Sequence, residues 1–464
     1  MFEIDYARGL LALQHELLLF AAVFFAIGLI DELAVDAIYA WNRLAGRVRT
    51  PRVDEAELQT DRLSGTSAVF IPAWRESAVI GATLSHALAV WPQRELRIYV
   101  GCYRNDPATI ASAMAAAAGD RRVRIVIVGE DGPTSKSHCL NRLYQALTVD
   151  EARSGSRAHM VVLHDAEDMV DPAAMPLLDR AVWDYDFVQL PVMALPPSDS
   201  RWVASHYSDE FAESHAKAMV VRQLLGAAIP GAGVGCAIRR GMLDQLASEG
   251  SAKPFPEGCL TEDYEIGLRI GALGGKSKFL RLRTDSGRLI STRAYFPDQL
   301  ALAVRQKTRW VHGIALQGWD RLGWQGSLRQ RWMTLRDRRG PFAAMLIAIA
   351  YLLVALGAII HFASHMGVVE PIQSSPALTL LLWLTSLGFV WRLIMRAVFT
   401  AREYGLQQGL LAVPRALVSN VIAIMSARRA LAAYVRFLRG EAVTWDKTEH
   451  SAHPVLGPAR EQLA

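Results

Sequence analysis

The chain has 464 residues, enough for two or three domains, and 52% of them are hydrophobic, which is high for a wholly soluble protein. Its formal net charge is only +5, and its four cysteines are widely spaced without a Cys-x-x-Cys pair. This composition argues against a disulfide scaffold, a cysteine-built zinc site and a nucleic-acid partner, and it suits a reducing compartment.

The first predicted element is the apolar run LLLFAAVFFAIGLI at residues 17–30, which residues 10–13 can extend to the length of a membrane helix. The run lacks the basic start and the cleavage site of a signal peptide, so we expect a retained anchor. With the basic linker that follows, it forms a predicted N-terminal segment, residues 1–50.

Short β-branched runs alternate with helical patterns through the middle of the chain. Strands are predicted at five positions: 67–74, 96–103, 123–129, 159–166 and 187–194. Helices are predicted over 76–90, from Pro107 onward, and over 136–147. This alternation predicts an α/β domain at residues 51–340, Rossmann-like, with a mostly parallel sheet and helices on both faces.

Polar residues follow three of these strands directly: Glu76 after the first, Asp106 after the second, and Asp165 with Glu167 after the fourth. The carboxyl ends of parallel strands meet at one edge of the sheet, where ligands bind in such folds. We therefore expect these carboxylates to lie around one site.

The stretch VVLHDAEDMVDP (161–172) ends an apolar strand in a cluster of acids. Along an extended strand end, Asp165 and Glu167 point to the same side, where two carboxylates can hold a hard divalent cation that clamps phosphate oxygens. The alternative is helix capping. We accept it for Asp171, which precedes Pro172, and reject it for Asp165, which lies too early to cap a helix.

Glycine-rich stretches do not match a nucleotide-binding loop. GEDGPTSKSHCLN (129–141) has its glycines and lysine at the wrong spacing for a P-loop, and GAGVG (231–235) follows no strongly predicted strand. Lys136 can still reach a phosphate from the start of its helix.

Two later motifs have both functional and ordinary structural explanations. LTEDYEIGLRI (260–270) begins with Thr261, a good N-cap, followed by acids, which is also how an ordinary helix begins. RQKTRW (305–310) sets Gln306, Arg309 and Trp310 on one helical face. That face suits a sugar ring beside a diphosphate, and it is equally common on protein surfaces.

The C-terminal third is predicted to meet the membrane again. Phe342–Ile360 is uncharged and Ala377–Trp391 is strongly apolar, so residues 341–400 predict two transmembrane helices. Arginine-rich stretches flank the middle domain and predict that it is cytoplasmic. Residues 401–445 predict amphipathic interfacial or re-entrant helices, with a fourth span left open. Residues 446–464 form a polar tail that we expect to be poorly ordered.

In this order, the motifs GCYRNDPAT, GPTSKSHCLN, HDAEDMVDP, LTEDYEIGLRI and RQKTRWVHGIALQGW make the chain resemble the membrane-integrated family-2 glycosyltransferases. That group includes the processive cellulose, chitin and hyaluronan synthases of bacteria. Within it the chain is most similar to the phage-adsorption protein B type. The resemblance covers about residues 65 to 320.

The resemblance implies a GT-A fold that uses a nucleotide-diphosphate sugar, usually a UDP-sugar. Glu76 and Asp106 match acids that line the nucleotide pocket, and Lys136 matches a basic residue near it. Asp165 and Glu167 stand at the metal-binding D-x-D of the family, which implies Mg²⁺ or Mn²⁺, with Asp165 also next to the nucleotide sugar. Glutamate at the second position departs from the family pattern and makes a direct metal contact of Glu167 less certain.

By the same resemblance, Asp263, which follows Glu262 in the T-E-D motif, matches the catalytic general base. Gln306, Arg309 and Trp310 match the motif that binds the diphosphate and the acceptor sugar. An inverting displacement without a covalent intermediate follows from the resemblance. Relatives of the protein B type commonly carry a module that binds cyclic di-GMP, and we find no motif of such a module in this sequence.

The expected function is therefore polymerisation of an exopolysaccharide at the bacterial inner membrane. The expected partners are a UDP-sugar donor, a glycan or lipid-linked acceptor, the lipid bilayer, and an export partner in the periplasm or outer membrane. Two alternatives stay open: transfer of a single sugar to a lipid-linked acceptor, and a non-catalytic membrane scaffold of an export or phage-adsorption complex.

Overall fold

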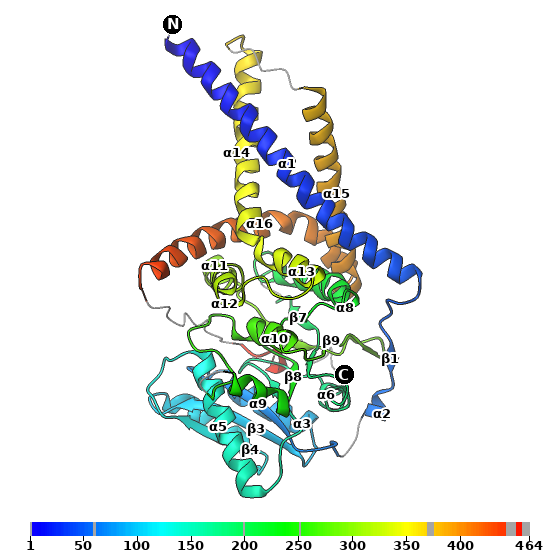
Figure 1. Cartoon of the computed structure of the whole chain (residues 1–464), viewed down its shortest axis with the longest axis vertical. Coiled ribbons are helices and arrows are strands. Elements are labelled where there is room, and N and C mark those ends of the chain that lie inside the picture. The colour runs from blue at the N-terminus through cyan, green and yellow to red at the C-terminus, as the bar shows by residue number, and fades with distance from the viewer. Residues whose placement is uncertain are drawn as a thin grey trace.

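In the computed structural model, long helices at one end of the molecule stand on an α/β domain at the other (Figure 1). The structure describes residues 2–58, 62–197, 200–249, 252–368, 375–441 and 452–456. The predicted α/β fold with membrane-type helices is confirmed.

The main sheet of the α/β domain has seven strands in the order β4-β3-β2-β5-β8-β6-β9. In that order their bounds are Val123–Val128, Leu96–Tyr103, Ser67–Pro72, Met160–Leu163, Cys236–Arg239, Phe187–Gln189 and Ser277–Phe279. Only β8 runs antiparallel to its neighbours. Two short parallel pairs accompany the sheet: β7 (Val192–Leu195) with β11 (Thr292–Tyr295), and β1 (Arg52–Val53) with β10 (Arg283–Thr284).

Helices cover both faces of the sheet because its strands are apolar on both sides. Along β2, Val69 and Ile71 pack into one core, whereas Ala68 and Phe70 pack into the other. The helices on the first face are α3 (Ile80–Val90), α4 (Pro107–Ala117) and α6 (Ala174–Ala181). Those on the second are α5 (Lys136–Ser154), α9 (Arg240–Ser248) and α10 (Glu262–Ala272).

Several predicted boundaries differ from the observed ones. The strand predicted over 159–166 ends at Leu163, and a turn follows at residues 166–167. Asp165 and Glu167 therefore do not lie along an extended strand. The strand predicted over 187–194 is two strands, β6 and β7, which belong to different sheets. Strand β8 was not predicted.

Further shorter helices complete the domain. They are α2 (Glu55–Leu58), α7 (Ser205–Glu213), the π-helix Ser214–Ala218, α8 (Met219–Leu224), α11 (Leu300–Val311), the π-helix His312–Gln317, α12 (Gly318–Leu322) and α13 (Leu328–Arg338). Of these, α8, α11 and α13 lie directly beneath the long helices (Figure 1).

Four helices of the described chain are long and apolar enough to cross a membrane by length and composition: α1 (Phe2–Leu44), α14 (Gly340–His365), α15 (Pro376–Tyr404) and α16 (Leu406–Leu438). Large apolar side chains on them are exposed, such as Val354 at 71% and Leu387 at 62%. Exposure of this kind is unfavourable in water and suits contact with lipid. The first three match the predicted spans.

Helix α16 is arranged differently from the other three. It runs across the lower ends of α14 and α15 (Figure 1). It is one continuous helix through Pro414, so the re-entrant pair of helices that the sequence left open is not formed. Ser426 Oγ donates to the Val304 carbonyl of α11 at 3.2 Å, and Asn420 Nδ2 donates to the Tyr351 hydroxyl of α14 at 2.9 Å.

Buried ion pairs attach the long helices to the domain. Arg415 of α16 is fully buried and binds Asp209 of α7 through two bonds, Nη2 to Oδ1 at 2.6 Å and Nε to Oδ2 at 3.0 Å. Arg396 of α15 donates to the same carboxylate at 3.1 Å. Burial raises the pKa of Asp209, and the two arginines oppose that rise. The buried charge of Asp209 is therefore neutralised by arginines that lie far along the chain.

Of the predicted polar tail, residues 446–451 and 457–464 lie outside the described residues. The described part contains a short 3₁₀ helix, Pro454–Leu456. His453 before it is buried, with Nε2 3.2 Å from the Asp168 carbonyl oxygen. This part of the tail is thus packed against the domain, which the prediction of poor order did not anticipate.

Candidate functional site

A cavity of about 160 Å³ opens at the carboxyl ends of the central strands. Nearly all the candidate site residues predicted from the sequence line this cavity. They are Glu76, Lys136, Asp165, Glu167, Glu262, Asp263, Gln306, Arg309 and Trp310. These residues come from five separate stretches of the chain, so the fold, and not sequence proximity, assembles them.

The loop after β5 holds Asp165 in place through its neighbour Asp168. The buried Asp168 carboxylate Oδ2 accepts a hydrogen bond from the Asp165 backbone N–H at 2.9 Å and lies 2.8 Å from His164 Nδ1. The Ala166 carbonyl in the same loop accepts from the Thr83 hydroxyl of α3. The orientation of Asp165 therefore comes from this turn and not from an extended strand. Sequence reasoning assigned no role to His164 or Asp168.

Lys136, the first residue of α5, links the two acidic regions of the cavity. Its Nζ lies 2.6 Å from Asp165 Oδ1 and 3.7 Å from Glu262 Oε1. Burial alone would lower the pKa of Lys136, but Asp165, Glu262 and Asp263 outweigh it and hold that pKa above its usual value. The ammonium thus stays charged and partly neutralises three carboxylates.

Glu262 and Asp263 form the first turn of α10 beside the GAGVG loop. The Asp263 carbonyl accepts from the Gly231 N–H at 3.2 Å. At Gly233, which has φ +84°, a Cβ would lie 2.5 Å from Asp263 Oδ2. The loop thus allows the Asp263 carboxylate to point into the cavity. Sequence reasoning dismissed GAGVG as a nucleotide motif, and nothing in the sequence itself signals this packing role.

The two adjacent acids of α10 are harder to ionise than free carboxyls. Burial and the neighbouring Asp263 raise the pKa of Glu262 to about 7, with Lys136 opposing. Burial also raises the pKa of Asp263, again with Lys136 opposing and Asp165 adding to the rise. A buried carboxyl pair with raised pKa values is suited to accepting a proton during a reaction.

Helix α11 presents Gln306, Arg309 and Trp310 to the cavity from one face, as their spacing predicts. Gln306 Oε1 and Arg309 Nε are buried, and within the described residues they have no hydrogen-bond partner. Buried polar atoms nearly always have partners in a folded protein. Both residues line the cavity, so their side chains are candidates for contact with a polar ligand.

An aromatic group surrounds the Trp310 end of the cavity. Tyr207 packs edge-on to Trp310 at 5.9 Å between ring centroids, and Phe296 lies 6.5 Å from it. Lys307 Nζ lies 5.0 Å from the centroids of both Tyr207 and Trp310. Phe211 and Phe296 also line the cavity, and the sequence analysis named neither of them.

Three residues differ from their predicted placement. Asp106 is not part of the cavity wall: its carboxylate accepts from the Arg75 N–H at 2.6 Å and from the Thr109 N–H at the start of α4. Thr261 stands at the N-cap of α10 without making the side-chain capping bond. Asp171 Oδ1 accepts from the Ala173 N–H at 3.1 Å, in the turn that leads into α6, whose N-cap is Ala173.

The residues that line the cavity supply part of a binding site for a hard divalent cation. Among the residues that the structure describes, no three His, Cys, Asp or Glu side chains converge on one point. Asp165 and Glu167 nevertheless both line the cavity, and Mg²⁺ typically takes one or two carboxylates together with phosphate oxygens and water. The Lys136 ammonium beside Asp165 shows that this carboxylate already attracts positive charge.

Comparisons with known proteins agree with this geometry. Residues 65–313 match a family model described as glycosyltransferase like family 2. Bacteriophage adsorption protein B of Escherichia coli K12 and bacteriophage N4 adsorption protein B of Escherichia coli O157:H7 are each 33% identical to the chain over 482 residues. The match covers 98% of this chain, which spans 64% of the length of those relatives.

A solved structure shares the fold. The mannosyltransferase PcManGT from Pyrobaculum calidifontis, in complex with GDP-Man and Mn²⁺, superimposes with a TM-score of 0.51 at 15% identity. The similarity covers 86% of this chain and 99% of that one. At this identity the likeness establishes the fold and leaves the donor and acceptor undetermined.

Proposed function

The chain belongs to glycosyltransferase family 2, and from that premise we propose that it transfers a sugar from a nucleotide-diphosphate donor, of the UDP-sugar class, to a growing glycan. The observation that carries this proposal is the cavity in which Asp263, Lys136 and Arg309 meet. The cavity thus contains a carboxylate that can act as a base and two cations that can contact a diphosphate.

In the proposed reaction Asp263 accepts the proton of an acceptor hydroxyl. The hydroxyl oxygen bonds to the anomeric carbon while the bond from that carbon to the diphosphate oxygen breaks. The sugar leaves on the acceptor with inverted configuration, and the nucleoside diphosphate departs with the electron pair. Arg309 and Lys136 stabilise its growing negative charge. Gln306 and Trp310 orient the acceptor sugar by hydrogen bonding and ring contact.

Asp165 and Glu167 are the residues that would hold a divalent cation, Mg²⁺ or Mn²⁺. When bound, the cation supplies further neutralisation of the leaving diphosphate. The chain's own contribution is to orient Asp165 through Asp168, with Lys136 beside the same carboxylate.

We further propose that the site faces the cytoplasm of a bacterium, at the inner membrane, and that the enzyme polymerises an exopolysaccharide. The basic stretches at residues 41–52 and 329–340 flank the domain on the membrane side, which supports the orientation. Polymerisation is supported by the position of α11 directly beneath α16 and the spans, where a product can leave toward the bilayer for an export partner.

Release of nucleoside diphosphate by the purified protein in detergent tests the proposal. The panel comprises UDP-hexoses, UDP-N-acetylhexosamines and GDP-Man, each with Mg²⁺ or Mn²⁺. We expect turnover with one donor, dependence on the cation, and loss of turnover in Asp263→Asn. If no donor is turned over and no nucleotide binds, the proposal is wrong and a non-catalytic scaffold is the better explanation.

A second expected result concerns Gly233. Replacement by alanine forces a Cβ toward Asp263 Oδ2 in a backbone conformation that L-residues rarely adopt. Because a displacement near 1 Å can cost about 100-fold in rate, we expect turnover to fall by roughly that factor. Gly226→Ala is the matched control, since Gly226 also has positive φ, at +67°, with open space around it. Equal losses in both variants would show that backbone strain alone is responsible.

A further inference from the structure

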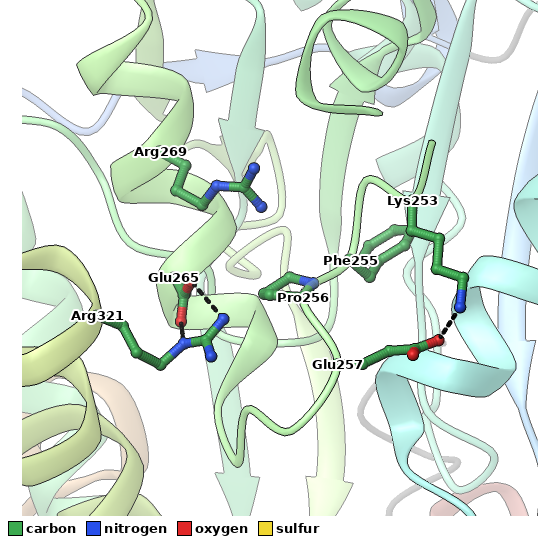
Figure 2. A pocket seen from close by; sticks show the side chains of 7 residues that line it. All are labelled: Lys253, Phe255, Pro256, Glu257, Glu265, Arg269 and Arg321. Atoms are coloured by element: carbon green, nitrogen blue, oxygen red, sulfur yellow. Dashed lines mark hydrogen bonds and ion pairs between the residues drawn. The ribbon is translucent and has the colours of Figure 1, made fainter. Parts of the chain in front are cut away.

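A second cavity, of about 270 Å³, lies beside α10 (Figure 2). Seven residues line it: Lys253, Phe255, Pro256, Glu257, Glu265, Arg269 and Arg321. They come from the loop before α10, from α10 itself and from α12. None of them lines the catalytic cavity.

The wall of this second cavity carries three cationic side chains and two carboxylates. Figure 2 shows Arg321 paired with Glu265 on one side and Lys253 paired with Glu257 on the other. The first pair is bidentate, at 2.8 and 3.2 Å, and the second spans 2.8 Å. Both carboxylates of the wall are therefore already neutralised by these cations.

Arg269 is the remaining cation of the wall. Its Nη1 donates to the Pro254 carbonyl at 3.2 Å, and within the described residues it forms no ion pair. A guanidinium without a carboxylate partner, in a concave site, is suited to two parallel hydrogen bonds to a phosphate. Phe255 and Pro256 add an apolar wall for the group that carries the phosphate.

We propose that this cavity binds a phosphate-bearing small molecule, with Arg269 as the principal contact and Arg321 and Lys253 at its sides. The site is separate from the donor site, and its occupation does not depend on the proposed reaction. The proposed ligand is a phosphate monoester, with its organic part against Phe255 and Pro256.

The second cavity is connected to the proposed catalytic residues through shared structural elements. The loop at residues 253–260 lines the second cavity with Phe255 and the catalytic cavity with Cys259. Cys259 Sγ also donates to Glu265 Oε2 at 3.1 Å, and Arg321 holds the same carboxylate from α12. A bound phosphate thus fixes α10, which begins with Glu262 and Asp263, against α12.

Inorganic phosphate is the probe. Equilibrium dialysis of the detergent-solubilised full chain, with UDP and Mg²⁺ at saturating concentrations to fill the donor site, measures its binding. We expect one additional phosphate per chain, and binding weakened about tenfold or more in Arg269→Gln, because a charge-assisted bidentate contact is lost. Arg153→Gln, an exposed arginine of α5, should bind phosphate as the unaltered chain does.

Lys253→Gln is a second variant should Arg269→Gln unfold, which thermal unfolding reports, and it should also weaken phosphate binding. No saturable binding, or equal binding in all variants, overturns the proposal. The assay needs no turnover, so its outcome stands whether or not a sugar donor is found. In an active enzyme, phosphate should change kcat in a saturable way that Arg269→Gln abolishes.

Discussion

Replacement of Asp263 by asparagine should reduce turnover by a factor on the order of 10² to 10⁴, because the amide cannot accept the proton of the acceptor hydroxyl. The shape of the side chain is preserved, and the bond from the Tyr264 N–H to Oδ1, at 2.9 Å, can persist. Nucleotide binding should therefore remain. The measurement is nucleoside diphosphate release beside nucleotide affinity, with Asp120→Asn in a distant turn as the control.

The pH dependence of turnover gives this result a second check. The pKa of Glu262 is raised to about 7 and that of Asp263 is also raised, and the base must be ionised to act. Turnover of the unaltered enzyme should therefore rise with pH over a range that lies above the usual titration range of an aspartate. In Asp263→Asn the repulsion on Glu262 is gone, so any residual rise should move to lower pH. A profile unchanged by the substitution would contradict the assignment of the base.

The largest expected loss of stability follows from Arg415→Met. The substitution leaves the buried Asp209 carboxylate with Arg396 as its remaining arginine. Removing one partner of a buried pair typically costs about 3–5 kcal/mol, because the other charge stays buried. We expect the free energy of unfolding, measured by SDS titration in mixed micelles, to fall by about 3 kcal/mol.

Two controls separate this effect from a general loss of an arginine. Arg428→Met removes an exposed arginine from the same helix and should change the free energy of unfolding little. Adding Asp209→Asn to Arg415→Met removes the stranded charge and should recover part of the loss. If Arg428→Met and Arg415→Met behave alike, the buried pair does not anchor α16.

Much of the fold was predictable because its signals are local. Strands β2, β3 and β4 are runs of apolar residues long enough to be recognised alone, and the parallel arrangement follows from the helices between them. The gathering of candidate residues around one cavity was predictable for a similar reason, since Glu76, Asp165 and Glu167 follow such strands. Spacing alone was enough for Gln306, Arg309 and Trp310, which share one face of α11.

Other features depend on contacts between distant segments and have no local signal. Gly231 and Gly233 matter only because α10 packs against them, and Asp209 is buried by α15 and α16, nearly two hundred residues later. Asp106 is a different case. It precedes Pro107 as Asp171 precedes Pro172, so the capping argument applied to one aspartate was available for the other.

The course of α16 has a consequence for how the bilayer itself acts on the enzyme. Within six residues this helix bonds to α14 through Asn420 and to α11 through Ser426, and α11 carries the Trp310 ring. A membrane of different hydrophobic thickness changes the tilt of the spans at modest energetic cost. Through α11, that tilt can reach the Trp310 end of the cavity. Lipid acyl-chain length should thus change the KM for the acceptor, whose proposed contact Trp310 lies on α11.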